Sequence, residues 1–307
     1  MLGLEVVKII LYTLAYTMSS SAEGFDEAAK EILQKTDLIA SEEFGLADLI
    51  SLVDPFDSNA EQATGTRGAL LILQKLFQQE ASKNWGFSCL PRPWKSASET
   101  APELKSETEE ELPLASAQKH AFPSLTVPEP LQSGPNPIYP EVFFSVYQDQ
   151  ESETVPPQTD ITAFLVRDTL TDTINALDFN RNASAKFLIE MDCYFAPGTF
   201  VKRGTAFDKL RDLGLEKTWK PEDVAVEAAF SQLFKLPAPE HKLVYYHSVL
   251  TEACKIAPAA IAPSLGRAIR YMYRNVDRLD LEIAQRFLDW FAHHLSNFGF
   301  TWKWTEW

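Results

Sequence analysis

The chain has 307 residues and a mass of 34.6 kDa, and 45% of its residues are hydrophobic while 23% are charged. This balance excludes a wholly disordered protein and leaves room for about two domains. The net charge of −15 is a poor match for bare nucleic acid, because affinity for phosphate comes from clustered Lys and Arg.

Residues 1–94 predict three helices, at 3–18, 25–39 and about 67–81, from the spacing of their apolar residues. The ten mostly apolar residues 9–18 suggest a signal peptide at first sight. However, Glu5 precedes Lys8, so the positive region that opens such a peptide is missing, and ten residues cannot span a bilayer. We therefore predict a buried helix, no membrane segment, and a unit over 1–94 that is the end of a larger helical domain.

Residues 95–137 are rich in proline and acidic side chains. Twelve of the 19 prolines lie between Pro91 and Pro157, and six glutamates between 99 and 111 face one lysine, Lys105. Such a segment buries too little apolar surface to offset its ordering entropy, so we predict a disordered acidic linker. The aromatic segment 138–147 is the exception, and we expect it to dock on a folded unit as an extended arm or a short helix.

Residues 138–307 predict a second helical domain. Helices are expected over 160–177, capped by Asp160, and over 181–191, and further helices are expected to open at Pro221, at 239–240, at Pro263 and after Asp280. In the last helix, we expect Leu281, Ala284, Leu288, Phe291 and Leu295 to form the buried face, since they alternate spacings of three and four.

The helices come in pairs with short turns, and Pro221 and Pro263 stand 42 residues apart. This spacing falls in the ~40–47-residue period of HEAT-like repeats. We therefore predict an all-α protein whose helices form a HEAT-like α-solenoid, interrupted by the linker at 95–137. An irregular helical bundle is the alternative.

Catalytic and metal-binding patterns are not found in the sequence. It contains no His-Glu-x-x-His, no C-x-x-C pair, no G-x-S-x-G elbow and no Walker A loop. Cys193 and Cys254 are interpreted as small core residues. We predict no catalytic residue, no metal, no cofactor and no enzymatic activity.

Aromatic residues gather at the carboxyl end, where four of the seven tryptophans fall in the last 18 residues. Large aromatic rings close a solenoid core in one interpretation and form a partner-binding surface in the other, because Trp is enriched in interface hot spots. The candidate partner-binding residues are His294, Asn297, Phe300, Trp302, Trp304 and Trp307.

A small basic loop is the second candidate. Lys202 and Arg203 follow a Pro-Gly turn, and Lys209 and Arg211 come soon after. In an acidic protein this loop could contact RNA phosphate or an acidic partner, and a solvated loop is the other interpretation.

Several runs have a distinctive sequence: EHKLVYYHSVLTEACKIAP at 240–258, APSLGRAIR at 262–270 and RFLDWFAHHLSNF at 286–298, together with FAPGTFVKR at 195–203 and YPEVFF at 139–144. They resemble the large-subunit family of the nuclear cap-binding complex in a fungal-type version. The likeness covers 138–307, and residues 1–94 resemble the end of that family's first helical domain. The chain is therefore expected to cover the end of the first and most of the second helical domain of such a protein.

The resemblance implies helical-repeat domains of the initiation-factor-4G middle-domain type. It implies a non-enzymatic scaffold that supports RNA cap binding through a small RNA-recognition-motif subunit, and that acts with export and processing factors in splicing, nuclear export and transcript surveillance. It also implies a nuclear protein that shuttles to the cytoplasm. The alternative function is direct RNA binding by the helical repeats, through Lys202 and Arg203.

Overall fold

The computed structural model describes residues 2–20, 24–41, 68–92, 141, 143–147, 150–214 and 217–306. Over these ranges the regular structure is helical, and no strand occurs in them. The predicted linker at 95–137 lies outside them. The α-helices are α1 (Leu2–Ser19), α2 (Asp26–Ala40), α4 (Ala69–Ser82), α5 (Ile161–Ala176), α6 (Arg181–Ile189), α7 (Pro221–Leu233), α8 (Leu243–Ile256), α9 (Pro258–Arg274) and α10 (Leu281–Asn297).

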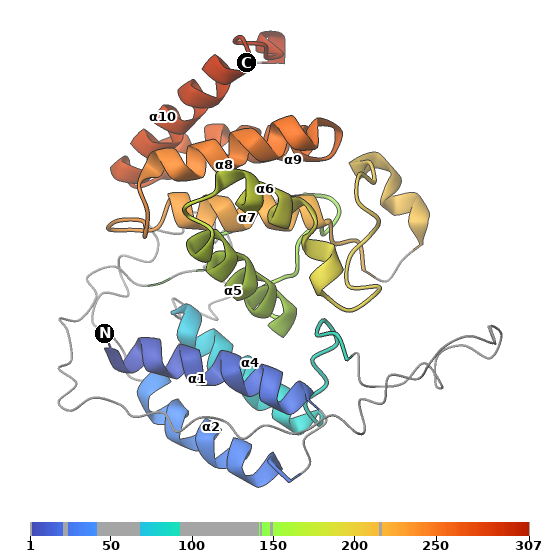
Figure 1. Ribbon diagram of the computed structural model, residues 1–307, viewed down its shortest axis with the longest axis vertical. Helices are drawn as coiled ribbons and strands as arrows, with labels where there is room; N and C mark the ends of the chain where they lie inside the picture. The colour runs from blue at the N-terminus through green and yellow to red at the C-terminus, as the bar shows by residue number, and fades with distance from the viewer. Residues whose placement is uncertain are drawn as a thin grey trace.

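Helices α1, α2 and α4 pack against one another at the amino-terminal end of the molecule (Figure 1). On α2 the buried face consists of Ala29, Leu33, Thr36 and Ala40. The Thr36 hydroxyl donates to Gln74 Oε1 on α4 at 2.9 Å, and Gln74 Nε2 donates to the Leu33 carbonyl at 2.8 Å. The three helices predicted from the first 94 residues are therefore confirmed, to within one or two residues at most ends.

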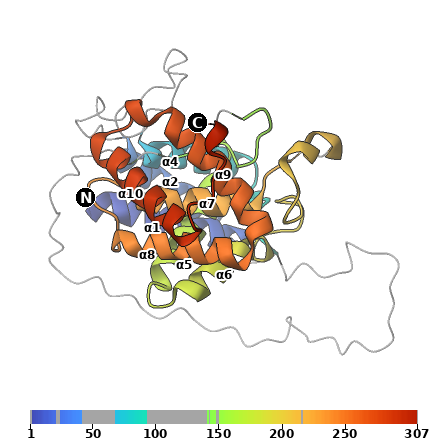
Figure 2. The same ribbon diagram turned by 90° about the horizontal axis from the view of Figure 1, so that it is seen from above.

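Helices α5 to α10 stack in two layers (Figures 1 and 2). Helix α5 packs on α7 and α7 on α9, while α6 packs on α8 and α8 on α10. Each helix thus contacts the helix two places further along the chain, which is the arrangement of a repeat solenoid. The predicted HEAT-like α-solenoid is confirmed.

Helix ends follow the local signals with two exceptions. Asp160 and Asp280 accept the backbone N–H of Thr162 and Glu282 at 2.8 and 2.9 Å, and Pro221 takes the first position of α7, as predicted. The expected start at Pro263 is wrong, because α9 begins at Pro258 and Pro263 lies inside it on the exposed side. Helix α8 begins at Leu243, a few residues later than expected.

The two helical groups share one continuous hydrophobic core. The Tyr16 hydroxyl on α1 lies 3.0 Å from Thr169 Oγ1 on α5, and the Ala196 N–H donates to the Cys89 carbonyl at 2.8 Å. Asp168 of α5 is partly buried at this junction, and its burial, with Asp172 beside it, raises its pKa to about 7.

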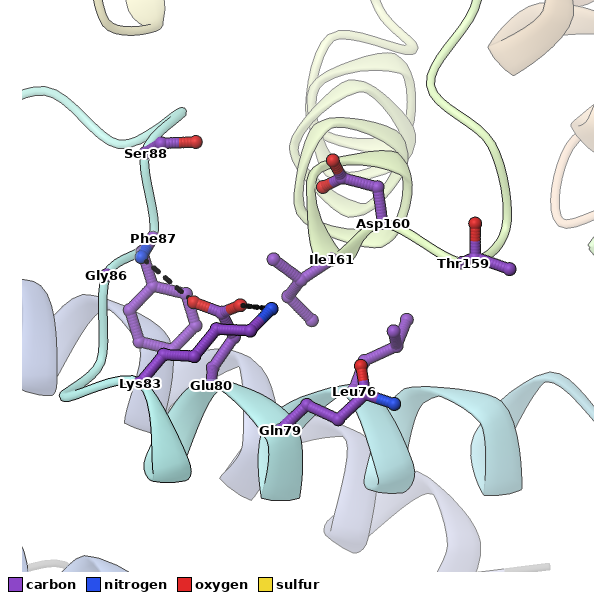
Figure 3. A pocket seen from close by; sticks show the side chains of 10 residues that line it. All are labelled: Leu76, Gln79, Glu80, Lys83, Gly86, Phe87, Ser88, Thr159, Asp160 and Ile161. Atoms are coloured by element: carbon purple, nitrogen blue, oxygen red, sulfur yellow. Dashed lines mark hydrogen bonds and ion pairs between the residues drawn. The ribbon is translucent and has the colours of Figure 1, made fainter.

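A hollow of about 330 Å³ lies at the same junction, between the second half of α4 and the first residues of α5 (Figure 3). Its polar lining is largely paired within the protein. The Glu80 carboxylate accepts the Phe87 N–H at 3.2 Å and the Lys83 ammonium at 3.5 Å, while Asp160 caps α5. These charged groups of the lining therefore contribute to the packing of the junction.

Three carboxylates on α7 are buried at the centre of the second helical group. Glu222, Asp223 and Glu227 are each at most 3% exposed. Asp223 accepts from Arg267 of α9 and from the Ser264 hydroxyl. Glu222 lies 3.5 Å from Lys220 Nζ. Each carboxylate thus has a basic partner, as buried charges require.

The extended segment 143–147, here called the strap, binds the same helix. Glu227 accepts the Val146 N–H at 3.0 Å, the Ser145 hydroxyl and the Arg167 guanidinium. The Tyr147 hydroxyl donates to the Ser264 carbonyl of α9 at 2.9 Å. The arm predicted at 138–147 therefore docks in extended form over the part that the structure describes.

Candidate partner-binding surface

Helix α10 positions the aromatic end of the chain. Its inner face consists of Ile283, Phe287 and Trp290, all fully buried, and the Trp290 ring meets Phe230 of α7 edge-on at 4.8 Å. Rings of this size dominate core energetics, so they set which side of α10 faces inward.

Arg286 fixes the same helix to the turn that follows α7. Its side chain is 5% exposed; it donates to Glu282 Oε1 at 2.8 Å, to the carbonyls of Lys235 and Pro237 at 2.8 Å each, and to the Leu233 carbonyl at 3.4 Å. These carbonyls belong to the last residue of α7 and to the turn after it, and a positive charge is favourable at the carboxyl end of a helix. One guanidinium therefore joins the end of α7 to α10.

The face of α10 that the sequence predicted as buried is only half buried. Phe291 and Leu295 are 9% and 7% exposed, but Leu281 and Leu288 are 72% and 55% exposed. The prediction is wrong for these two leucines because α10 carries two overlapping apolar faces. The face with the larger aromatic rings fills the core, and the regular three–four row is rotated outward.

His294 belongs to the core and not to the surface. It is 8% exposed and lies between two rings, with centroids 5.3 Å from Trp290 and 4.8 Å from Phe298. Burial, with His293 beside it, lowers its pKa to about 4. Its imidazole is therefore part of the packing at the end of α10.

The carboxyl end of α10 turns through a Schellman motif. The Phe300 N–H donates to the Leu295 carbonyl at 2.8 Å, and Gly299 between them has φ of +63°. Phe300 also adopts a positive φ of +56°, which is rare for an aromatic residue. Asn297 is exposed and its Nδ2 donates to the His293 carbonyl at 2.9 Å, so it closes the last turn.

The segment after this turn, residues 298–306, is here called the tail, and it folds back along α10. Trp302 is partly buried, meeting Phe291 edge-on at 5.5 Å, and the Arg270 guanidinium of α9 lies 5.4 Å from its ring centre. Trp304 is 50% exposed and its Nε1 donates to the Phe300 carbonyl at 3.3 Å, while Phe300 itself is 62% exposed. Trp302 thus holds the tail in place, and Phe300 and Trp304 are linked and face solvent.

The six candidate residues therefore separate. Phe300 and Trp304 form an exposed aromatic pair, Trp302 supports them, Asn297 closes the last turn of α10 and His294 is core. Trp307 lies outside the described residues. The sequence missed the exposure of Leu281 and Leu288. The sequence signal that could have indicated this exposure is the second set of apolar residues on the same helix.

The basic loop is less available than its sequence suggests. Arg203 Nε lies 3.0 and 3.1 Å from the two carboxylate oxygens of Asp192, and Nη2 lies 3.4 Å from Cys193 Sγ. Arg211 pairs with Glu151, and Lys202 is exposed. Cys193 is exposed too, so its expected place in the core is wrong, whereas Cys254 is buried.

No cluster of three or more His, Cys, Asp or Glu that could hold a metal occurs among the residues that the structure places. Within that same part, no helix has the length and apolarity needed to cross a membrane. Among the exposed side chains of α10 and the tail are the large apolar groups of Leu281, Leu288, Phe300 and Trp304, which suit contact with another macromolecule.

Comparison with known proteins finds one family. Residues 156–307 match the MIF4G-like family. The chain is 34% identical to nuclear cap-binding protein subunit 1 of Schizosaccharomyces pombe over 99% of its own length and 37% of that protein. It is 37% identical to nuclear cap-binding protein complex subunit 1 of Saccharomyces cerevisiae over 55% of this chain and 20% of the relative, and 29% identical to the human subunit 1 over 63% and 22%. The chain thus spans a fifth to somewhat over a third of the length of these relatives.

Proposed function

Since this chain belongs to the family of nuclear cap-binding protein subunit 1 and has a MIF4G-like domain over residues 156–307, we propose that it is a non-enzymatic scaffold subunit of a nuclear cap-binding complex. The observation that carries this proposal is the 34% identity to the Schizosaccharomyces pombe subunit over nearly the whole chain. The large exposed apolar side chains at the carboxyl end of the solenoid support a binding role.

In this proposal the cap is held by another protein. The net charge of −15 disfavours direct binding of RNA phosphate by the chain, so a small RNA-recognition-motif subunit contacts the capped RNA. The assembled complex then acts with processing and export factors in mRNA splicing, nuclear export and transcript surveillance. Its site of action is the nucleus, with shuttling to the cytoplasm.

The contact surface for the small subunit is the exposed aromatic pair of the tail. Phe300 and Trp304 present large apolar area that is already ordered by the Schellman turn and by Trp302. Preordered aromatic side chains make good interface anchors, because little conformational entropy is lost when they are covered.

The test is co-expression of this chain with the small subunit, followed by retention on a cap-analogue resin. The double variant Phe300→Ala/Trp304→Ala is expected to lower the retained amount of this chain by about tenfold or more, since hot-spot aromatics each contribute on the order of 2 kcal/mol. Phe179→Ala is the matched control, because Phe179 is 80% exposed on the turn between α5 and α6.

Three outcomes separate the parts of the proposal. If the unaltered chain, co-expressed with the small subunit, is not retained on the resin, the scaffold function is wrong for this chain. If the double variant is retained like the control, the aromatic pair is not the contact surface. The alternative, direct RNA binding, requires that the isolated chain bind RNA with steep salt dependence and lose that binding in Lys202→Ala/Arg203→Ala. The pairing of Arg203 with Asp192 disfavours it.

A further inference from the structure

The outer side of α10 carries an apolar row of Leu281, Ala284 and Leu288, here called the outer row. Leu281 is 72% and Leu288 55% exposed, and Ala284 between them is partly buried. The row continues into Phe291, which is covered because Trp302 of the tail packs on it. One end of a single apolar line is therefore occupied by the tail, while the other end faces solvent.

The spacing of the outer row indicates what shape would cover it. Its residues are separated by three and then four positions, which places them in one line along a helix. Side chains in such a line fit between those of a second helix in knobs-into-holes packing. A strand has a side-chain repeat of two and does not match this line.

The charges beside the row favour a basic partner. Asp280 and Asp289 lie along the same stretch of chain, where the third carboxylate, Glu282, is already paired with Arg286. The guanidinium of Arg286 is turned inward to Glu282 and to backbone carbonyls, so Arg278 is the cation left on the exposed side of this stretch in the part that the structure describes. A second copy of the chain would bring the same carboxylates together, which is unfavourable.

We propose that the outer row is a docking surface for an amphipathic α-helix of a partner protein, with apolar residues at spacings of three and four and Lys or Arg beside them. This surface is separate from the Phe300 and Trp304 pair and goes beyond the proposed scaffold function. It holds whether or not the small subunit uses the tail.

The experiment uses the whole 307-residue chain and a labelled synthetic helix of about three heptads, with Leu in the apolar positions and Lys beside them. Fluorescence anisotropy is expected to show saturable binding. Leu281→Ala/Leu288→Ala is expected to weaken it by about tenfold or more, because each leucine covered on binding contributes over ~1.4 kcal/mol. Leu38→Ala/Val244→Ala is the control, since these residues are 75% and 57% exposed elsewhere and their loss should leave binding unchanged.

Two further peptides test which features of the basic helix are needed for binding. A peptide with Glu in place of Lys tests charge, and a scrambled peptide of the same composition tests the spacing. Equal binding by either peptide, no binding by the basic helix, or no loss in the Leu281/Leu288 variant would overturn the proposal. Sedimentation that shows a dimer dependent on these leucines would assign the row to a second copy and overturn it as well. None of these readouts uses the cap-analogue resin, so failure here is distinguishable from failure of the scaffold function.

Discussion

Helices α7 and α10 depart in opposite directions from the usual relation between side-chain polarity and burial. Helix α7 buries three carboxylates that its sequence places among small apolar residues, while α10 exposes two leucines that belong to a regular apolar pattern. Burial in this molecule is therefore decided by partners and not by side-chain polarity alone. The α7 carboxylates have Arg167, Lys220 and Arg267, whereas the outer row of α10 has no cover over Leu281 and Leu288.

The largest expected effect comes from removing a carboxylate of α7. Glu227→Ala leaves Arg167 buried without its partner and the Val146 N–H without its acceptor. Breaking a buried pair in this way costs about 3–5 kcal/mol of unfolding free energy. Denaturant unfolding measures it, with Glu31→Ala on the exposed side of α2 as the control that should leave stability nearly unchanged. Equal effects of the two changes would mean that the α7 network adds nothing to stability.

Neighbouring residues of α10 give the sharpest contrast. Phe287 is fully buried and Leu288 is 55% exposed. Phe287→Ala is expected to cost about 3–5 kcal/mol through the cavity it leaves, and Leu288→Ala no more than ~0.5 kcal/mol. Thermal and denaturant unfolding of both variants checks this. A costly Leu288→Ala in the isolated chain would show that the outer row is already covered.

The smallest effect concerns pH and two buried histidines, His247 of α8 and His294 of α10. Burial lowers the pKa of both His247 and His294 to about 4, from the usual 6.5. Between these pH values the unfolded chain binds more protons than the folded one, so stability falls as the pH drops from about 6.5 to 4. Across this window, the free energy of unfolding should therefore change less with pH in His247→Phe/His294→Phe than in the unaltered chain. If stability depends on pH equally in both proteins, the lowered pKa values of these histidines are wrong.

Local signals predicted most of the helix framework. Asp160, Asp280 and Pro221 act through groups within their own first turn, so the sequence is sufficient to identify them. Glu222 and Asp223 show the limit of that reasoning. Their position in the first turn of α7 is favourable for the helix dipole, but it does not indicate that they are buried. Burial and pairing depend instead on Arg267, 44 residues after Asp223, and on the loop at Gly204.

The surface prediction had a similar outcome. The aromatic tail was identified from composition, and the structure places Phe300 and Trp304 at its surface. Which tryptophan supports and which is exposed could not be read from the sequence, because it depends on the turn at Gly299 and on Arg270 of another helix. The two apolar faces of α10 were both visible, but only the ring of Phe230 on α7 decides between them.

The strap has a consequence for the order in which the domain is built. Residues 145 and 147 close onto Glu227 and Ser264, which follow 82 and 117 positions later. A solenoid held together by neighbouring repeats alone can form progressively as it leaves the ribosome, but the contact of Tyr147 must wait until α9 has been made. During that interval the α7 carboxylates lack part of their partners. The vulnerable species in synthesis is therefore the nascent chain that ends between α7 and α9.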